Sequence, residues 1–168
     1  LLISCMLLSF SAFAQTIVEV NSNITSNTTW TPNNIYILKG TNFIYVTNNA
    51  VLTVEPGTLV KGDPAALVVT RGSKLIAEGL AHKPIVFTSA KPAGQRAAGD
   101  WGGIVLLGSA KVNCPGGECT IEGGVDPVLG KYGGTDDASS VGSLKYVRIE
   151  FAGIAFNPNN ETNGLTMG

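Results

Sequence analysis

Charge is scarce in this chain, and its scarcity excludes several functions. Only 14% of the 168 residues are Asp, Glu, Lys or Arg, and the net charge is −1. A surface that binds nucleic acid or anionic lipid needs clustered Lys and Arg, and the sequence has no such cluster. We therefore expect no nucleic acid among the partners of this protein.

Other signatures are missing as well. No stretch keeps helical periodicity for three turns, and nothing beyond residue 14 approaches the ~20 apolar residues of a transmembrane helix. The sequence contains no nucleophile elbow, phosphate-binding loop, dinucleotide fingerprint or metalloprotease helix. The pattern thus argues against a helical fold, a membrane span and those enzyme classes.

Glycine is abundant, with 21 residues, and many Asn and Thr residues accompany short β-branched runs. Gly and Asn tolerate the left-handed backbone conformations that tight turns require. This composition predicts an all-β fold of short strands joined by turns. We expect strands at residues 35–40, 43–46, 51–54, 66–70, 74–77, 85–88, 104–107 and 146–151.

Two segments, residues 52–62 and 67–79, resemble each other. Leu52 and Leu67, Gly57 and Gly72, and Thr58 and Ser73 each lie 15 residues apart. A unit of this kind cannot bury its apolar face alone and must stack on copies of itself. The repeat therefore predicts a right-handed parallel β-helix or related β-solenoid.

Alternation assigns the faces of these strands, because successive side chains of a strand point to opposite sides. Apolar side chains outside the inward set, such as Val68, Val86 and Tyr146, indicate that loops or a partner cover part of the outer surface. The inward set is Leu52, Val54, Leu67, Val69, Ile85, Phe87, Val147, Ile149 and Phe151, and the outward polar set is Thr53, Glu55, Thr70, Arg148 and Glu150.

The ends of the chain suggest an exported protein. Residues 1–14 are apolar or small and close with Ala12-Phe13-Ala14, which resembles the cleavage site of a signal peptide. Lipidation at Cys5 is an alternative, although the apolar run continues past that residue. We expect a polar lead-in or N-terminal cap at residues 15–34 and β-helix coils at residues 35–168, truncated at the C-terminus.

The remaining cysteines, Cys114 and Cys119, are predicted to form a disulfide. The Pro-Gly-Gly between them supplies a turn, and export into an oxidising compartment permits the bond. A zinc site would need two further ligands, and the single histidine, His82, is more than thirty residues away. The pair lies in the longer of two expected insertions, residues 91–99 and 112–142, which are the loops where a binding site is expected.

Four segments together resemble the secreted right-handed parallel β-helix proteins of Bacteroidetes-type bacteria. These segments are residues 52–58, 84–89, 99–105 and 144–153, and the resemblance extends over nearly all of the chain after residue 14. It implies an exported or surface-attached protein, in some cases sorted by type IX secretion. The resemblance implies no catalytic residues, because that family has no agreed activity.

Several residues are candidates for a site. Asp136 and Asp137, in a Gly-rich loop, are candidate calcium ligands, because hard cations bind carboxylate and carbonyl oxygens. The alternative is that they cap backbone amides in a turn.

Trp101 is a candidate sugar-stacking residue, and core packing is its alternative. Trp30 and the aromatics expected to be exposed, Tyr36, Tyr45 and Tyr132, are further candidates.

Arg148 and Glu150 share the outer face of a strand, where they either contact a ligand or form a surface ion pair. A glycosidase needs two suitably spaced carboxylates, and the sequence has no ladder of carboxylates at equivalent repeat positions.

We therefore expect an exported, non-catalytic scaffold or adhesive protein whose loops contact extracellular glycan or a surface protein. The alternative is a polysaccharide-active enzyme of the pectate-lyase-like or hydrolase kind, whose site lies largely beyond residue 168. No cofactor is expected other than the possible calcium ion.

Overall fold

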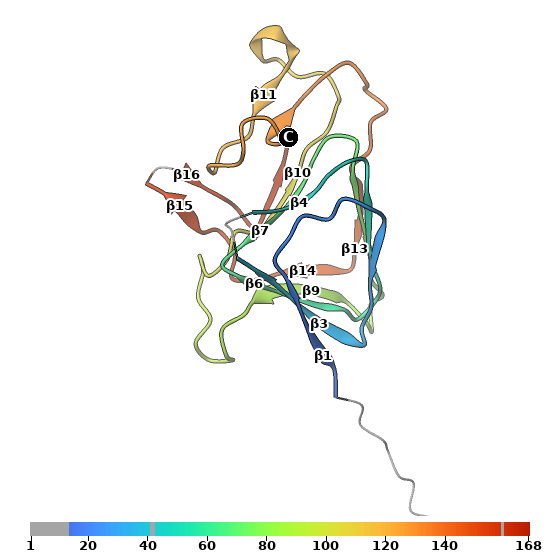
Figure 1. The fold of residues 1–168 in the computed structure, drawn as a ribbon, viewed down its shortest axis with the longest axis vertical. Coiled ribbons are helices and arrows are strands. Elements are labelled where there is room, and N and C mark those ends of the chain that lie inside the picture. The colour runs from blue at the N-terminus through green and yellow to red at the C-terminus, as the bar shows by residue number, and fades with distance from the viewer. Residues whose placement is uncertain (1–13, 41–42, 159) are drawn as a thin grey trace, which may run out of the picture.

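In this computed structural model, which describes residues 14–40, 43–158 and 160–168, the chain winds through three parallel β-sheets in a repeating order (Figure 1). Sheet A consists of β1 (Thr16–Val20), β3 (Asn34–Lys39), β6 (Leu59–Asp63), β9 (Ile85–Ser89) and β14 (Val147–Ile149). Sheet B consists of β4 (Phe43–Val46), β7 (Ala66–Val69), β10 (Ile104–Leu106) and β17 (Leu165–Met167). Sheet C consists of β2 (Thr28–Trp30), β5 (Val51–Val54), β8 (Lys74–Glu78) and β13 (Gly142–Lys145).

Each strand of these three sheets pairs in parallel with the equivalent strand of the next coil. In sheet B, Ile44 pairs with Leu67 and Leu67 with Ile104, so three fully buried side chains form one column through the core. Crossovers between parallel strands are right-handed in nearly all proteins. The predicted right-handed parallel β-helix is confirmed. Among the described residues, no helix is long and apolar enough to cross a membrane. The expected signal peptide and Cys5 lie, apart from Ala14, outside the described residues.

One coil is longer than the 15-residue offset suggested. Leu52 pairs with Leu75 in sheet C, 23 residues further on, whereas Leu67 lies in sheet B. The offset instead relates two corners of one type, residues 55–58 and 70–73, which are closed by backbone hydrogen bonds of 3.2 and 3.0 Å and have Gly at positive φ. Such turns favour Gly at their third position. The sequence repeat was therefore a recurrence of turn chemistry.

Alternation predicted the faces well inside the strands and failed at their ends. The inward residues expected in β5, β7 and β9 are buried, and Val147 and Ile149 of β14 pack against the core. Phe151 was expected to point inward, yet it is 38% exposed, because it follows the end of β14 at a corner where φ is +60°. Thr70 was expected outside, but it is buried at the end of β7, where its Oγ1 donates to the carbonyl oxygen of Val46 at 3.0 Å.

The chain covers the outer face of sheet B with its own insertion. Between β10 and β13 lie the 3₁₀-helix η1 (Pro115–Gly117) and the hairpin of β11 (Cys119–Thr120) and β12 (Lys131–Tyr132). Val68 and Val105, which face outward from sheet B, are buried with Val125 of the insertion. The predicted cover over Val68 is confirmed, whereas Tyr146 remains 54% exposed.

A second hairpin, β15 (Ala155–Asn157) and β16 (Asn160–Glu161), also reaches this side of the molecule. Its Phe156 lies 4.8 Å from Phe43 of β4, measured between ring centroids. In Figure 1 the strand β11 projects from one side of the coil and β15 and β16 from another. The insertion between β10 and β13 and the β15–β16 hairpin both leave the coil at corners, so the stacked strands stay in register.

The predicted lead-in, residues 15–34, contains β1 and β2. These strands pair with β3 and β5 and form a first coil at one end of the stack. Two asparagine side chains of this segment accept hydrogen bonds from backbone N–H groups of the next coil. Asn23 Oδ1 accepts from the N–H of Tyr45 at 3.1 Å, and Asn27 Oδ1 accepts from the N–H of Val51 at 2.9 Å. Unpaired edges are a liability in sheet proteins, and these two bonds occupy backbone N–H groups near this end of the coil, where β1 and β2 are the edge strands of sheets A and C.

Three aromatics that the sequence offered as stacking candidates are buried, including Tyr36 and Tyr45, which were expected to be exposed. Trp30 and Tyr36 stack on each other with ring centroids 4.8 Å apart, and Tyr45 packs in the outer cluster on sheet B. Aromatic rings contribute large apolar area, which a narrow coil needs to fill its interior.

We expect Gly62→Ala to destabilise the protein by about 2 to 3 kcal/mol, because overpacking a core forces side chains and backbone apart. A Cβ at Gly62 would stand 2.5 Å from Cβ of the buried Trp101. Gly164→Ala is the control, because a Cβ there meets only Ile149 at 3.6 Å. Urea unfolding followed by tryptophan fluorescence measures both, and equal losses in the two variants would contradict the packing argument.

We expect opposite effects at the two related corners. Ser73 Oγ is buried and has no hydrogen-bond partner within the described part of the chain, whereas Thr58 Oγ1 donates to the carbonyl oxygen of Glu55 at 2.7 Å. Ser73→Ala should raise the free energy of unfolding by about 1 kcal/mol, and Thr58→Val should lower it by about 1 kcal/mol. Destabilisation by Ser73→Ala in the same urea titration would show that its hydroxyl is satisfied in solution.

Candidate functional site: a cleft at one corner of the coil

The structure places the predicted site residues at separate positions. Trp101 is fully buried, and its Nε1–H donates to the carbonyl oxygen of Glu150 at 2.7 Å. Gly62 on the coil below leaves the space that the indole fills. In this structure the ring offers no face to a sugar, and the geometry matches the core-packing alternative.

Arg148 and Glu150 lie on the outer face of sheet A and form an ion pair with each other. Glu150 also accepts a hydrogen bond from Thr88 Oγ1 at 3.0 Å on the neighbouring strand β9. The charges of the pair are thus satisfied by its own neighbours. This arrangement is that of a surface ion pair.

The two aspartates of the Gly-rich loop bind groups of the protein itself. Asp136 Oδ1 accepts from the N–H of Ala138 at 3.1 Å, and Asp137 accepts from both the N–H and the Nζ of Lys111 at 3.0 and 2.9 Å. The Lys111 side chain, and then its backbone N–H, lower the pKa of Asp137. No group of three or more His, Cys, Asp or Glu residues in the described ranges is arranged to hold a metal ion.

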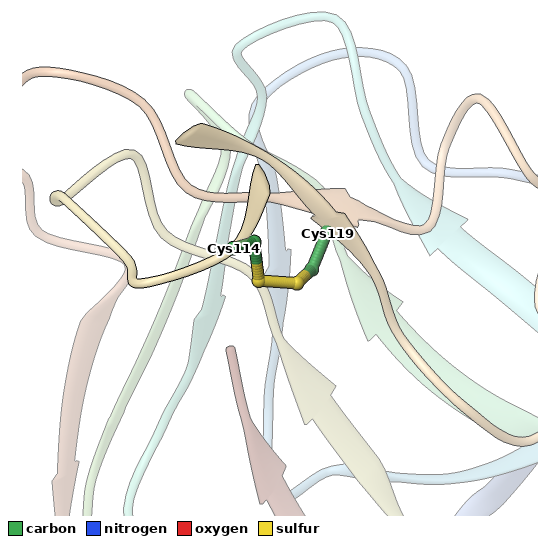
Figure 2. The surroundings of a disulfide bond; sticks show 2 residues. All are labelled: Cys114 and Cys119. Carbon is green, nitrogen blue, oxygen red and sulfur yellow. A yellow bond between two sulfur atoms is a disulfide. The ribbon is translucent and has the colours of Figure 1, made fainter. Parts of the chain in front are cut away.

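Cys114 and Cys119 form the predicted disulfide, with their Cα atoms 5.9 Å apart (Figure 2). The bond closes the short loop that contains η1, and β11 begins at Cys119. Glu118, immediately before Cys119, is therefore held at a fixed place in the insertion.

Two side chains from the coil anchor this insertion. Arg71, in the corner between β7 and β8, forms an ion pair with Glu118 and donates from Nη1 to the carbonyl oxygen of Gly133 at 2.8 Å. Tyr45 Oη on β4 accepts from the N–H of Asp126 at 3.1 Å, and burial raises the pKa of this phenol. Together with the apolar contacts on sheet B, these bonds hold the insertion against the corner.

A cleft of about 310 Å³ lies where the insertion meets the corner. Ligand sites in proteins typically measure about 300 to 1,000 Å³ and combine apolar surface with a few polar groups. One wall is formed by the corner turns of two successive coils and the other by the loop before β12. The lining residues are Thr47, Asn48, Asn49, Thr70, Arg71, Val128, Leu129 and Lys131.

The electrostatics of the cleft depend on Glu118. Its carboxylate contacts Arg71 and lies 3.6 Å from Lys131 Nζ, and these two cations, Arg71 first, lower the pKa of Glu118. Among the described residues that line the cleft, two are cationic and none is acidic. The cleft therefore offers cationic, amide and hydroxyl groups beside the apolar side chains of Val128 and Leu129.

Sequence reasoning missed this cleft. Its corner wall includes Asn48 and Asn49, whose φ angles of +60° and +56° are unusual for residues other than glycine. The Thr-Asn-Asn-Ala run at residues 47–50 signalled a turn, and nothing local signalled a partner across from it. Among the predicted ligand-binding residues, Tyr132 adjoins Lys131 but is half-buried in the outer cluster on sheet B.

Asp100 holds the shorter insertion, residues 91–99, through hydrogen bonds to its carboxylate. Its carboxylate accepts from Lys91 Nζ at 2.6 Å, from the N–H of Ala97 at 2.9 Å and from Ser89 Oγ at 2.7 Å. These bonds, Lys91 first, lower the pKa of Asp100 from 3.8 to about 2. The loop is thus closed on itself beside the buried Trp101.

We expect Asp100→Asn to lower the melting temperature at neutral pH, and the difference from wild type to vanish in acid. The folded-state pKa lies below the unfolded one, so the carboxylate stabilises the fold above about pH 3.8, and this stabilisation is lost as the pH falls toward about 2. Melting curves followed by circular dichroism between pH 7 and pH 2 test this. Asp63→Asn, at the exposed end of β6, is the control. A wild-type advantage that persists undiminished at pH 2 would contradict the assignment.

Comparison with protein families identifies the fold. The model of the pectate-lyase like beta helix domain matches residues 22–167, so the chain belongs to this family. Comparisons with curated proteins and with solved structures found no match.

Proposed function

We propose that this chain is an exported, non-catalytic β-helix scaffold that binds extracellular glycan in its corner cleft. Export is supported by the signal-peptide pattern of residues 1–14 and by the Cys114–Cys119 bond, because disulfides persist in oxidising compartments. The protein then acts at the cell surface or after release from it.

The observation that carries the glycan proposal is the composition of the cleft. The side-chain amides of Asn48 and Asn49 supply hydrogen-bond donors and acceptors, which suit sugar hydroxyls. Asn48 Nδ2 donates one hydrogen bond to the carbonyl oxygen of Thr25 at 3.2 Å, which leaves its second N–H and its Oδ1 for a ligand. Val128 supplies apolar surface, being 73% exposed. Stacked coils hold the corner wall rigid, which reduces the ordering cost of binding.

The alternative is a polysaccharide-active enzyme, a pectate-lyase-like lyase or a hydrolase, and its hydrolase form has less support in the described part of the chain. Hydrolysis of a glycosidic bond requires two carboxylates on either side of it. The described residues that line the cleft include no carboxylate, and Glu150 on sheet A is occupied by Arg148 and Thr88. Membership of a pectate-lyase-like family keeps the alternative open to test.

A glycan-array screen of the secreted protein tests the proposal, with both retained ligand and released oligosaccharide measured. We expect retention without release. Asn49→Gly should weaken retention by about tenfold, because Gly accepts the positive φ while the amide is lost. Gln95→Gly removes an exposed amide at a different corner and should leave retention unchanged.

We expect retention to be the same with and without calcium, because Asp136 and Asp137 already bind backbone amides and Lys111. Released oligosaccharide would show that the protein cleaves glycan and would favour the enzyme alternative over the scaffold proposal. Absence of any retained glycan would contradict the proposal that the cleft binds glycan. Retention by Asn49→Gly equal to that of the wild type would also contradict it.

A further inference from the structure

We infer that the corner cleft binds glycans that carry an anionic substituent, a carboxylate or a sulfate ester, and that Glu118 is an internal counter-ion with which this substituent competes. The inference rests on the proposed glycan-binding function and adds the class of ligand. It follows from the way the charges of Arg71, Lys131 and Glu118 are distributed around the cleft.

Arg71 retains donors for a ligand. A guanidinium carries five N–H groups, and the contacts of Arg71 with Glu118 and with the Gly133 carbonyl oxygen use Nη1. No contact in the described part of the chain occupies Nε or Nη2. Because the side chain lines the cleft and is 30% exposed, these N–H groups are accessible to a ligand in the cleft.

Lys131 is bound more loosely. Its Nζ stands 3.6 Å from Glu118 Oε2, which exceeds the usual length of a hydrogen bond, and its side chain is 43% exposed. An exposed ion pair at this distance contributes little. The ammonium group is therefore available to a second anion without the loss of a strong bond.

Of the two nearby carboxylates, only that of Glu118 contacts the cations that line the cleft. Glu118 contacts the two cations but does not itself line the cleft. Asp126 Oδ1 accepts from the N–H groups of Val128 and Leu129, both at 2.8 Å. A single internal carboxylate thus faces two lining cations, which leaves one positive charge for a ligand.

The geometry suits an oxyanion that is attached to a sugar. Arg binds carboxylate and sulfate oxygens through paired N–H groups, and Lys adds a point charge. Asn49 and the part of the Asn48 amide that Thr25 does not occupy lie on the adjoining wall, where the hydroxyl groups of the same ligand would meet them. Binding of this kind weakens as salt increases, because exposed charges are screened.

Paired glycans that share a backbone test the inference, with sulfated, carboxylated and neutral forms of each. The variants are Lys131→Met, Glu118→Gln and, as a control cation on the outer face of sheet A, Lys61→Met. Arg71 is left intact, because it also holds the insertion through Gly133. Circular dichroism and retention of the neutral glycan confirm that each variant is folded.

We expect the wild type to retain acidic forms at least about tenfold better than their neutral counterparts. Lys131→Met should remove most of that preference, Glu118→Gln should strengthen acidic binding about threefold or more, and Lys61→Met should change neither. Inorganic sulfate should compete with the acidic forms and not with the neutral ones.

Equal retention of acidic and neutral forms would overturn the inference while leaving the glycan-binding function in place. A preference for acidic forms that survives Lys131→Met, or that Lys61→Met removes equally well, would also overturn it, because the anion would then bind elsewhere on the surface. Failure to retain any glycan would instead remove the proposed function itself.

Discussion

The structure depends on columns of side chains that stack from one coil to the next. Ile44, Leu67 and Ile104 form such a column in sheet B, and all three are fully buried. Burial of one such side chain contributes about 1.5 to 3 kcal/mol, which a single coil cannot gain alone. Hydrogen bonds between coils fix the register, and a shift by one residue would turn every inward side chain outward. Extra residues are therefore accommodated only at corners, as between β10 and β13, where the chain returns in register with Gly142 paired to Leu75.

This constraint also determines where the cleft forms. The outer face of sheet B is apolar at Val68 and Val105, so it requires a cover, and the insertion between β10 and β13 provides one. The edge of this cover reaches the corner turns of two coils, and it is anchored by Arg71 in one corner and by Tyr45 in β4. The cleft thus has one wall from the rigid coil and one from the insertion. Loops on a rigid scaffold carry function in many folds for the same reason.

The sequence predicted what local periodicity controls. Alternation identified the buried residues of β5, β7 and β9, and the outward Val68 correctly indicated a covered face. It failed where a strand ends: Phe151 and Thr70 occupy corners, where backbone turns decide the direction of a side chain. The burial of Trp101 depends on the glycine at position 62 in the coil below, and that relation becomes visible only once the pairing of β6 with β9 is known. The disulfide was predictable because both cysteines and their turn lie within six residues.

The candidate site could not be predicted in the same way, because its contacts join distant residues. Arg71 and Glu118 are 47 residues apart, and Tyr45 and Asp126 are 81 apart. In the sequence, aromatic residues were candidates for sugar stacking and acidic residues were candidates for calcium binding. In the structure, Trp101 fills the core and Asp137 binds Lys111. The charge of the cleft, in contrast, comes from Arg71 in a corner of the coil and Lys131 in the insertion. The insertion contributes no strand to the three stacked sheets. It follows that the charge of the cleft is separable from the fold: substitutions in the insertion change the charge that faces the corner, while the columns that hold the coils together remain untouched.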